Sequence, residues 1–226
     1  ILDNDILEGE LATRYGSFGA LFQRLFRDAG AHWSMDVFST PRWQYPTSFD
    51  TYDAVLLTGS GADAFSEEPW VVELRRQTSE LLRQNKKLVG VCFGHQLIAL
   101  CLGAPVGRAP QGWGVGRHTY DWHRADLGHA PERRQIALLA SHQDQVAALP
   151  PGATLVASSA FCPVAAFTVG DTVFCIQPHP EFEEALSAHL LDKRRNQLGE
   201  ALYRTAHNSL ALGHEVGVVG GEVLQH

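Results

Sequence analysis

One strand-to-helix segment constrains the fold of this chain more than any other stretch. Residues 88–91 are apolar and predict a short strand, and a helical pattern begins at His95. Between them stands Cys92, with Gly90 and Gly94 on either side. A reactive side chain on such a sharp turn needs neighbours without bulk, because the turn brings strand and helix close together. The segment therefore predicts a nucleophile elbow in which Cys92 is lifted clear of a sheet.

The elbow favours the reactive form of the Cys92 thiol. At the start of a helix, unpaired N–H groups and the positive end of the helix dipole both favour the thiolate. The alternative is a buried cysteine that packs as a small apolar side chain. We prefer that alternative for the other three cysteines, which have apolar neighbours: Cys101, Cys162 and Cys175. For Cys92 the flanking glycines favour catalysis.

A candidate base follows a second predicted strand, residues 173–176. His179 lies between two prolines, which restrict the backbone where the strand ends. Glu181, two residues further on, can bond one ring nitrogen of His179 and so select the tautomer. Taken alone, this His-Pro-Glu run would be interpreted as a surface His and Glu in a proline-kinked turn. Together with the elbow in an alternating α/β chain, it predicts a triad of Cys92, His179 and Glu181.

The two motifs resemble those of the class I glutamine amidotransferase domain: Gly-Val-Cys-Phe-Gly-His-Gln at residues 90–96 and Gln-Pro-His-Pro-Glu-Phe at residues 177–182. More narrowly, the chain is similar to the free-standing, GMP-synthase-like members, a group that also includes plant γ-glutamyl peptidases. The likeness runs from Ile1 to about Glu184 and continues more weakly to the end. Many hydrolases share an elbow, whereas an elbow with His-Pro-Glu is far more specific.

The resemblance implies roles for further residues. Backbone N–H groups of Gly59 and Phe93 would form the oxyanion hole, and two such donors are typically worth several kcal/mol. Ser141 and His142 match the first half of the family's Ser-His-Gly-Asp segment, whose backbone helps to hold the amino-acid end of a γ-glutamyl group. Gln96 would share that work.

Two segments depart from the family pattern. Gln143 replaces the glycine of Ser-His-Gly-Asp, and residues 58–65 differ from the Gly-Gly-Pro type of oxyanion loop. Without the resemblance, residues 141–144 would be interpreted as a polar turn at the end of a strand. Both departures alter the rim of the pocket, so they bear on the substrate and on the docking of a partner.

The resemblance implies hydrolysis of a γ-glutamyl amide bond through a thioester on Cys92, with no metal and no organic cofactor. Glutamine is the expected donor. Because 226 residues leave no room for a synthetase domain, its ammonia would pass to a separate synthetase subunit or be released freely. The alternative is a γ-glutamyl peptidase acting on glutathione-like peptides or conjugates.

Two other classes of protein compete with an amidohydrolase. A non-enzymatic regulatory subunit would be favoured by loss of the nucleophile or the base, and the sequence retains both. A redox-sensing protein of the DJ-1 type also has an elbow cysteine on a parallel sheet. Its oxidation chemistry does not require His-Pro-Glu.

Composition narrows the remaining options. The length fits one α/β domain spanning residues 1–226, and a net charge of −7 argues against a nucleic-acid partner. The basic cluster at residues 193–195 is interpreted as the solvated face of a helix. Without a long apolar run, a signal-peptide layout or a regular cysteine pattern, we expect no membrane partner and a cytoplasmic protein. Because Ile1 is not methionine, we expect the start of the first strand to be missing.

The order of the elements predicts the fold class. Strands and helices alternate in the first half, which predicts a mostly parallel central sheet with helices on both faces: strands at 35–38, 54–57 and 88–91, and helices at 18–26, 70–84 and 95–103. Ligands bind beyond the carboxyl ends of such strands, where Gly59, Cys92 and His179 fall.

The second half predicts an antiparallel extension of that sheet, with short strands at 116–122, 136–140, 154–158, 164–168 and 173–176. A helix from about residue 183 to 205, followed by a shorter one, would cover the sheet. His118, Asp121 and His123 suggest a metal site at first sight. Their alternation places His118 on the opposite face from the other two, so we expect none.

Overall fold

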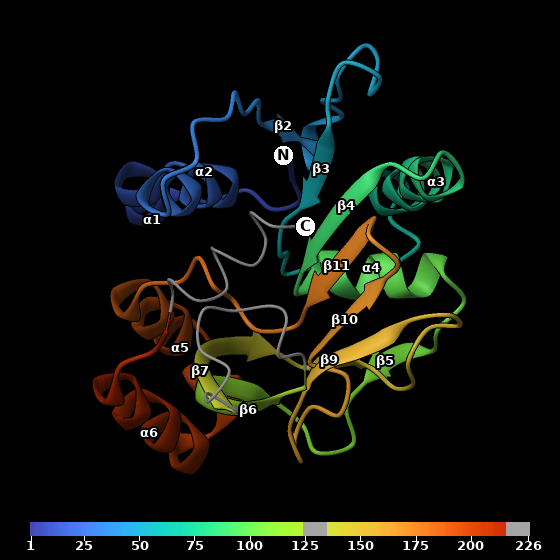
Figure 1. The fold of residues 1–226 in the computed structure, drawn as a ribbon. Helices are drawn as coiled ribbons and strands as arrows, with labels where there is room; N and C mark the ends of the chain where they lie inside the picture. The colour runs from blue at the N-terminus through green and yellow to red at the C-terminus, as the bar shows by residue number, and fades with distance from the viewer. Residues whose placement is uncertain (124–134, 216–226) are drawn as a thin grey trace.

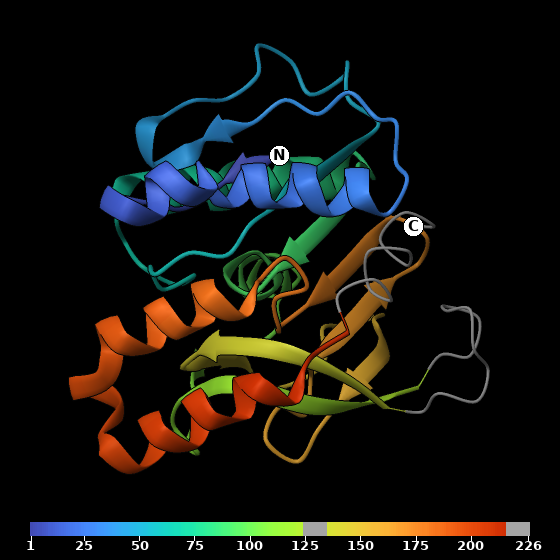
Figure 2. The same ribbon diagram turned by 90° about the vertical axis from the view of Figure 1, so that its left-hand side faces the viewer.

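In the computed structural model, the chain forms a central sheet with helices packed against both faces (Figures 1 and 2). The structure describes residues 1–123 and 135–215. Nine strands form the main sheet in the order β2-β1-β3-β4-β11-β10-β9-β6-β7. Their bounds are β1 Leu2–Asp3, β2 Phe38–Ser39, β3 Ala54–Leu57, β4 Lys87–Val91, β6 Gly114–Trp122, β7 Gln135–His142, β9 Thr154–Ser158, β10 Ala166–Val169 and β11 Val173–Ile176.

The predicted α/β fold class is confirmed. Strands β2, β1, β3, β4 and β11 are parallel, and β10, β9, β6 and β7 continue the sheet with antiparallel pairings. The sequence placed β11 in the antiparallel extension. This is correct for its pairing with β10, but β11 also pairs in parallel with β4. All four residues of β11 are buried, as expected for a strand at the centre of a sheet.

The helices are α1 Gly9–Tyr15, α2 Phe18–Asp28, α3 Pro69–Arg83, α4 Phe93–Cys101, α5 Glu184–Leu198 and α6 Glu200–Ser209, with short 3-10 turns at Thr40–Arg42 and Leu210–Leu212. The sequence did not predict α1, nor the small antiparallel sheet of β5 Val106–Arg108 and β8 Asp144–Val146. No helix within the described ranges has the length and apolar character needed to cross a bilayer.

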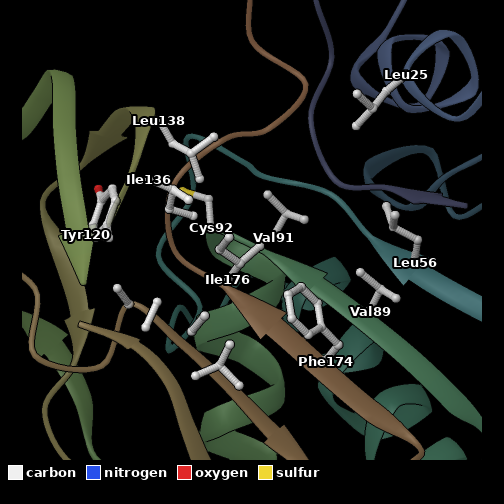
Figure 3. Close-up of a cluster of buried hydrophobic side chains, with 14 of the residues drawn as sticks. Leu25, Leu56, Val89, Val91, Cys92, Tyr120, Ile136, Leu138, Phe174 and Ile176 are labelled. Carbon is white, nitrogen blue, oxygen red and sulfur yellow. The ribbon is translucent and has the colours of Figure 1, made fainter. Parts of the chain in front are cut away.

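Alternation along the central strands produces two apolar layers. Val89 and Phe174 pack on the side of the sheet that α2 covers, in the cluster shown in Figure 3, whereas Leu88 and Val173 face α3 and α4. Full burial of each such side chain contributes roughly 1.5–3 kcal/mol. The two layers hold β3, β4 and β11 side by side, so their carboxyl ends meet at one edge.

Two predicted elements required correction. The strand predicted at residues 35–38 is observed at Phe38–Ser39, where it pairs with Leu2 and Asp3 of β1. The long C-terminal helix is interrupted at Gly199, whose φ of 75° lies in the left-handed region that glycine readily adopts. Helices α5 and α6 nevertheless pack against β6 and β7, as predicted.

Candidate functional site

Cys92 occupies a strained turn between β4 and α4. Its φ of 53° and ψ of −104° are unusual for a residue with a side chain and cost of order 1–3 kcal/mol. A Cβ on Gly90 would lie 2.7 Å from the backbone of Gly94, and one on Gly94 would collide with the carbonyl of Leu57. Both glycines are therefore required by packing, and the structure has the predicted elbow. Helix α4 begins directly at Phe93, two residues earlier than expected.

Apolar side chains surround the Cys92 thiol. Cys92 is buried, and Figure 3 shows it beside Val91, Ile136, Leu138 and Ile176. Ile136, Leu138 and Ile176 come from strands that are distant from Cys92 in the sequence. Such a wall excludes water from one side of the sulfur and strengthens its electrostatic interactions with charged neighbours.

The predicted base is held from several directions. The Nδ1 atom of His179 lies 2.7 Å from Oε1 of Glu181, and both side chains are buried. The backbone N–H of His179 donates to the carbonyl of Leu139 at 2.8 Å. Its ring stacks on Phe182, with 3.8 Å between centroids and 12° between planes. These contacts leave Nε2 as the ring nitrogen that Glu181 does not hold, and a Cβ on Gly59 would touch both the His179 ring and Cβ of Cys92, so the two side chains are neighbours.

Electrostatics favour the charged form of His179. Burial lowers the pKa of the imidazole, but the charges of Glu181 and Cys92, with hydrogen bonds to both, raise it to about 10. At neutral pH the ring is therefore an imidazolium, with a proton on both nitrogens. An imidazolium beside the sulfur stabilises a thiolate and can supply a proton to a departing group.

The loop after β3 passes close to both side chains. A Cβ on Gly59 would lie 2.9 Å from Cε1 of His179 and 3.6 Å from Cβ of Cys92. The loop is anchored by Asp5, whose Oδ2 accepts the N–H of Gly61 at 2.7 Å. Phe93, as the first residue of α4, has a backbone N–H without an acceptor inside the helix. The structure thus places Gly59 and Phe93 beside Cys92, and their oxyanion role stays a prediction.

The side chains of two predicted substrate residues, Gln96 and His142, bond within the protein, and their role toward a substrate stays a prediction. The Nε2 atom of Gln96 donates to the carbonyl of Asp144 at 2.9 Å and to Oε1 of Gln177 at 3.1 Å. His142 is buried, its Nδ1 lies 3.1 Å from the same Asp144 carbonyl, and burial lowers its pKa to about 3. Both side chains therefore contact the segment after β7, and Gln96 ties α4 to it.

A cavity of about 450 Å³ opens beside the triad. Gly59, Ser141, His179 and Phe182 form its inner wall. The rest of its lining comes from the segment after β1, from the loop after β3 and from the first two helices and α5: Asp5, Ile6, Leu7, Glu8, Leu11, Phe18, Ser60, Gly61, His189, Leu190, Lys193, Arg194 and Gln197. Of the three residues expected to contact substrate, Ser141 alone lines it.

Arg194 was not singled out by the sequence pattern. The prediction of a solvated face at residues 193–195 holds for Lys193 and Arg195, and it is wrong for Arg194. Arg194 is half-buried and donates from Nη1 to Oγ of Ser141 at 2.7 Å. Helical spacing from the buried residues Leu191 and Leu198 places both Arg194 and Arg195 near the apolar stripe, so the sequence did not distinguish them.

The other titratable candidates have different environments. In the described part of the chain, no group of three His, Cys, Asp or Glu side chains is arranged to hold a metal ion. His118 bonds the carbonyl of Val115, and His123 bonds Oγ of Ser158. Burial raises the pKa of Cys162 to about 12 and raises that of Cys175 well above its ordinary value, which disfavours their thiolates.

Comparisons with known proteins agree with this geometry. The family model described as glutamine amidotransferase class-I matches residues 14–194. The chain is 35% identical to γ-glutamyl peptidase 3 of Arabidopsis thaliana over 80% of this chain and 76% of the relative. It is 33% identical to a subunit of the glutamine-hydrolysing GMP synthase of Haloarcula marismortui, over 76% and 84%. The fold is similar to a glutamine amidotransferase from Thermotoga maritima, with 21% identity, a TM-score of 0.75, and coverage of 98% and 95%.

Proposed function

Because the chain belongs to the class I glutamine amidotransferase family, we propose that it hydrolyses γ-glutamyl amide bonds through Cys92. The observation that carries this proposal is the buried contact of 2.7 Å between His179 and Glu181, next to the elbow that holds Cys92. A nucleophile, a base and an orienting carboxylate in this order form a hydrolytic triad.

The proposed reaction proceeds in two halves. The Cys92 sulfur attacks the γ-carbonyl carbon, and the electron pair of the double bond moves onto its oxygen, which the N–H groups of Gly59 and Phe93 hold. The carbon–nitrogen bond breaks as Nε2 of His179 gives its proton to the departing nitrogen. In the second half His179 takes a proton from water, the hydroxyl displaces sulfur from the γ-glutamyl thioester, and glutamate leaves.

Two kinds of leaving group are consistent with the relatives. The names of the GMP synthase relatives include glutamine hydrolysis, which favours ammonia passing to a separate synthetase subunit. The γ-glutamyl peptidase names favour a peptide or conjugate as substrate.

We also propose that residues 1–226 act as one catalytic domain and that the protein is cytoplasmic.

Glutamate release from glutamine and from γ-glutamyl peptides by the purified protein tests the proposal. A γ-glutamyl electrophile followed by peptide mass spectrometry should label one residue, Cys92. The matched control is Cys101, which is half-buried and ends α4, the helix that begins directly after Cys92. Labelling at Cys101 instead, or glutamate release that persists in Cys92→Ala, would contradict a cysteine mechanism at the elbow.

A further inference from the structure

The ring of Phe182 lies face to face with the imidazole of the proposed base. The centroids of the Phe182 and His179 rings are 3.8 Å apart, and their planes differ by 12°. Two neutral aromatic rings disfavour this arrangement, because their electron-rich faces repel; they prefer offset or edge-on contacts with centroids about 4.5–7 Å apart. A positive charge over the face of a ring is attracted to it instead. The close parallel contact therefore favours an imidazolium at His179.

Two other buried histidines provide a comparison within the molecule. Burial lowers the pKa of His95 and of His142 to about 3, so both rings are neutral at neutral pH. The ring centroid of His95 lies 5.2 Å from that of Phe167, with 49° between planes, and that of His142 lies 6.2 Å from that of Phe161, with 63°. Both contacts are tilted or edge-on, as neutral rings prefer. The close parallel contact belongs to His179, the histidine whose pKa is raised.

Phe182 is itself held by two segments that are distant in the sequence. Its ring stacks with that of Phe18, the first residue of α2, with 5.9 Å between centroids and 17° between planes. Its carbonyl accepts a hydrogen bond of 2.9 Å from Nε2 of His214. The side chain of Phe182 is buried. A ring fixed in this way can hold the imidazole of His179 in one orientation.

Apolar packing by itself does not require an aromatic side chain at position 182. Phe182 belongs to a cluster of buried residues in which leucines fill neighbouring positions, among them Leu139 and Leu186. A leucine at position 182 would fill much of the same volume. It would lack the π face that attracts a cation.

We propose that Phe182 is a positioning residue for the base: its ring fixes the orientation of the His179 imidazole and stabilises the positive charge on it. This inference rests on the proposed role of His179 in γ-glutamyl hydrolysis. A stabilised imidazolium favours the thiolate at Cys92 over an uncharged pair of thiol and imidazole. A fixed ring also directs Nε2 of His179 at the nitrogen that it must protonate.

Charged and titratable groups face His179 from several elements. Glu181 precedes Phe182 in the chain, Cys92 lies at the elbow, and His142 ends β7. Further such side chains line the cavity that His179 shares: Asp5, Glu8, His189, Lys193 and Arg194. Substitution of Phe182 changes none of them, so a change in the titration of His179 reports on the lost ring.

Phe182→Leu removes the ring and keeps an apolar side chain. NMR titration follows the His179 imidazole directly and needs no substrate; the pKa of His179 should be lower by about 0.5–1 in the variant than in the wild type. The basic limb of the pH profile of kcat/KM should move to lower pH by the same amount. The acidic limb should stay, because the ring is charged on both sides of it. The loss of orientation should lower kcat by about tenfold, and Phe182→Tyr, which keeps a ring face, should retain most of the wild-type pKa.

Phe22→Leu is the matched control, since Phe22 is also buried and its ring contacts that of Phe26 within α2, at 6.1 Å. It should lower stability while leaving the pKa of His179 and the basic limb at their wild-type positions. If Phe182→Leu does not fold, Phe182→Met makes the same comparison with a side chain that adapts to gaps in a core.

A wild-type pKa of His179 in a folded Phe182→Leu or Phe182→Met variant would overturn the proposal, as would an equal decrease in Phe22→Leu. Failure of the proposed function gives a different result. In that case no γ-glutamyl compound, including glutamine, releases glutamate, although the titration of His179 still depends on Phe182.

Discussion

Gly59 lies so close to His179 that a Cβ at this position would be 2.9 Å from Cε1 of the imidazole. The ring cannot easily move away, because Glu181 holds Nδ1 and Phe182 covers one face. One short loop therefore sets how the base faces Cys92. The absence of a side chain at Gly59 is therefore a requirement of the site.

Gly59→Ala should lower kcat by about 10²-fold, because the added methyl group displaces either the ring or the proposed oxyanion donor. Steady-state kinetics on a γ-glutamyl substrate measure the effect. Gly61→Ala is the control in the same loop, since its Cβ would meet Asp5 at 3.5 Å, an ordinary contact. Equal losses in the two variants would show that the loop, rather than the contact with His179, is sensitive.

Cys92→Ala and His179→Ala should each reduce kcat by at least about 10⁴-fold, because the two residues act as one unit. The double variant should lose little more than either single variant. Near-ultraviolet circular dichroism should remain native for Cys92→Ala, which removes a single buried atom. Substantial glutamate release by either variant would remove the triad from the mechanism.

Glu181→Gln should impair turnover less than loss of Cys92, since an amide still bonds the ring but no longer stabilises its charge. The charge of Glu181 is one of the causes that raise the pKa of His179. NMR titration of His179 should therefore show a lower pKa in this variant than in the wild type. A loss of turnover as large as that of Cys92→Ala would give Glu181 an essential role.

The stability of the protein should depend on pH through His179. Its pKa is raised to about 10 in the folded state, against about 6.5 in an unfolded chain. The contribution to the free energy of unfolding is therefore fully present below about pH 6.5 and is lost as the pH rises to about 10. Urea titrations at pH 6, 8 and 10 should show the difference between wild type and His179→Gln shrinking. A difference that grows with pH would contradict a raised pKa.

The sequence alone was sufficient for features that depend on neighbouring residues. The spacing of Gly90, Cys92 and Gly94 identified the elbow, and the His-Pro-Glu run identified the contact between His179 and Glu181. Each of these patterns spans only a few residues, and the backbone geometry of a short strand or turn depends mainly on those residues. The alternation of strands and helices along the chain predicted that Cys92 and His179 meet at one edge of the sheet. The pairing of β4 with β11 places them there.

Only the tertiary structure decided which long-range neighbours complete the site. The bond between Arg194 and Ser141 joins residues 53 positions apart, and the direction of Gln96 depends on the packing of α4 against the segment around Asp144. Such contacts depend on how each helix is rotated about its axis against the sheet. Packing of side chains throughout the core determines that rotation. A local pattern marks a residue as basic or helical, but it does not specify the cavity into which that rotation turns it.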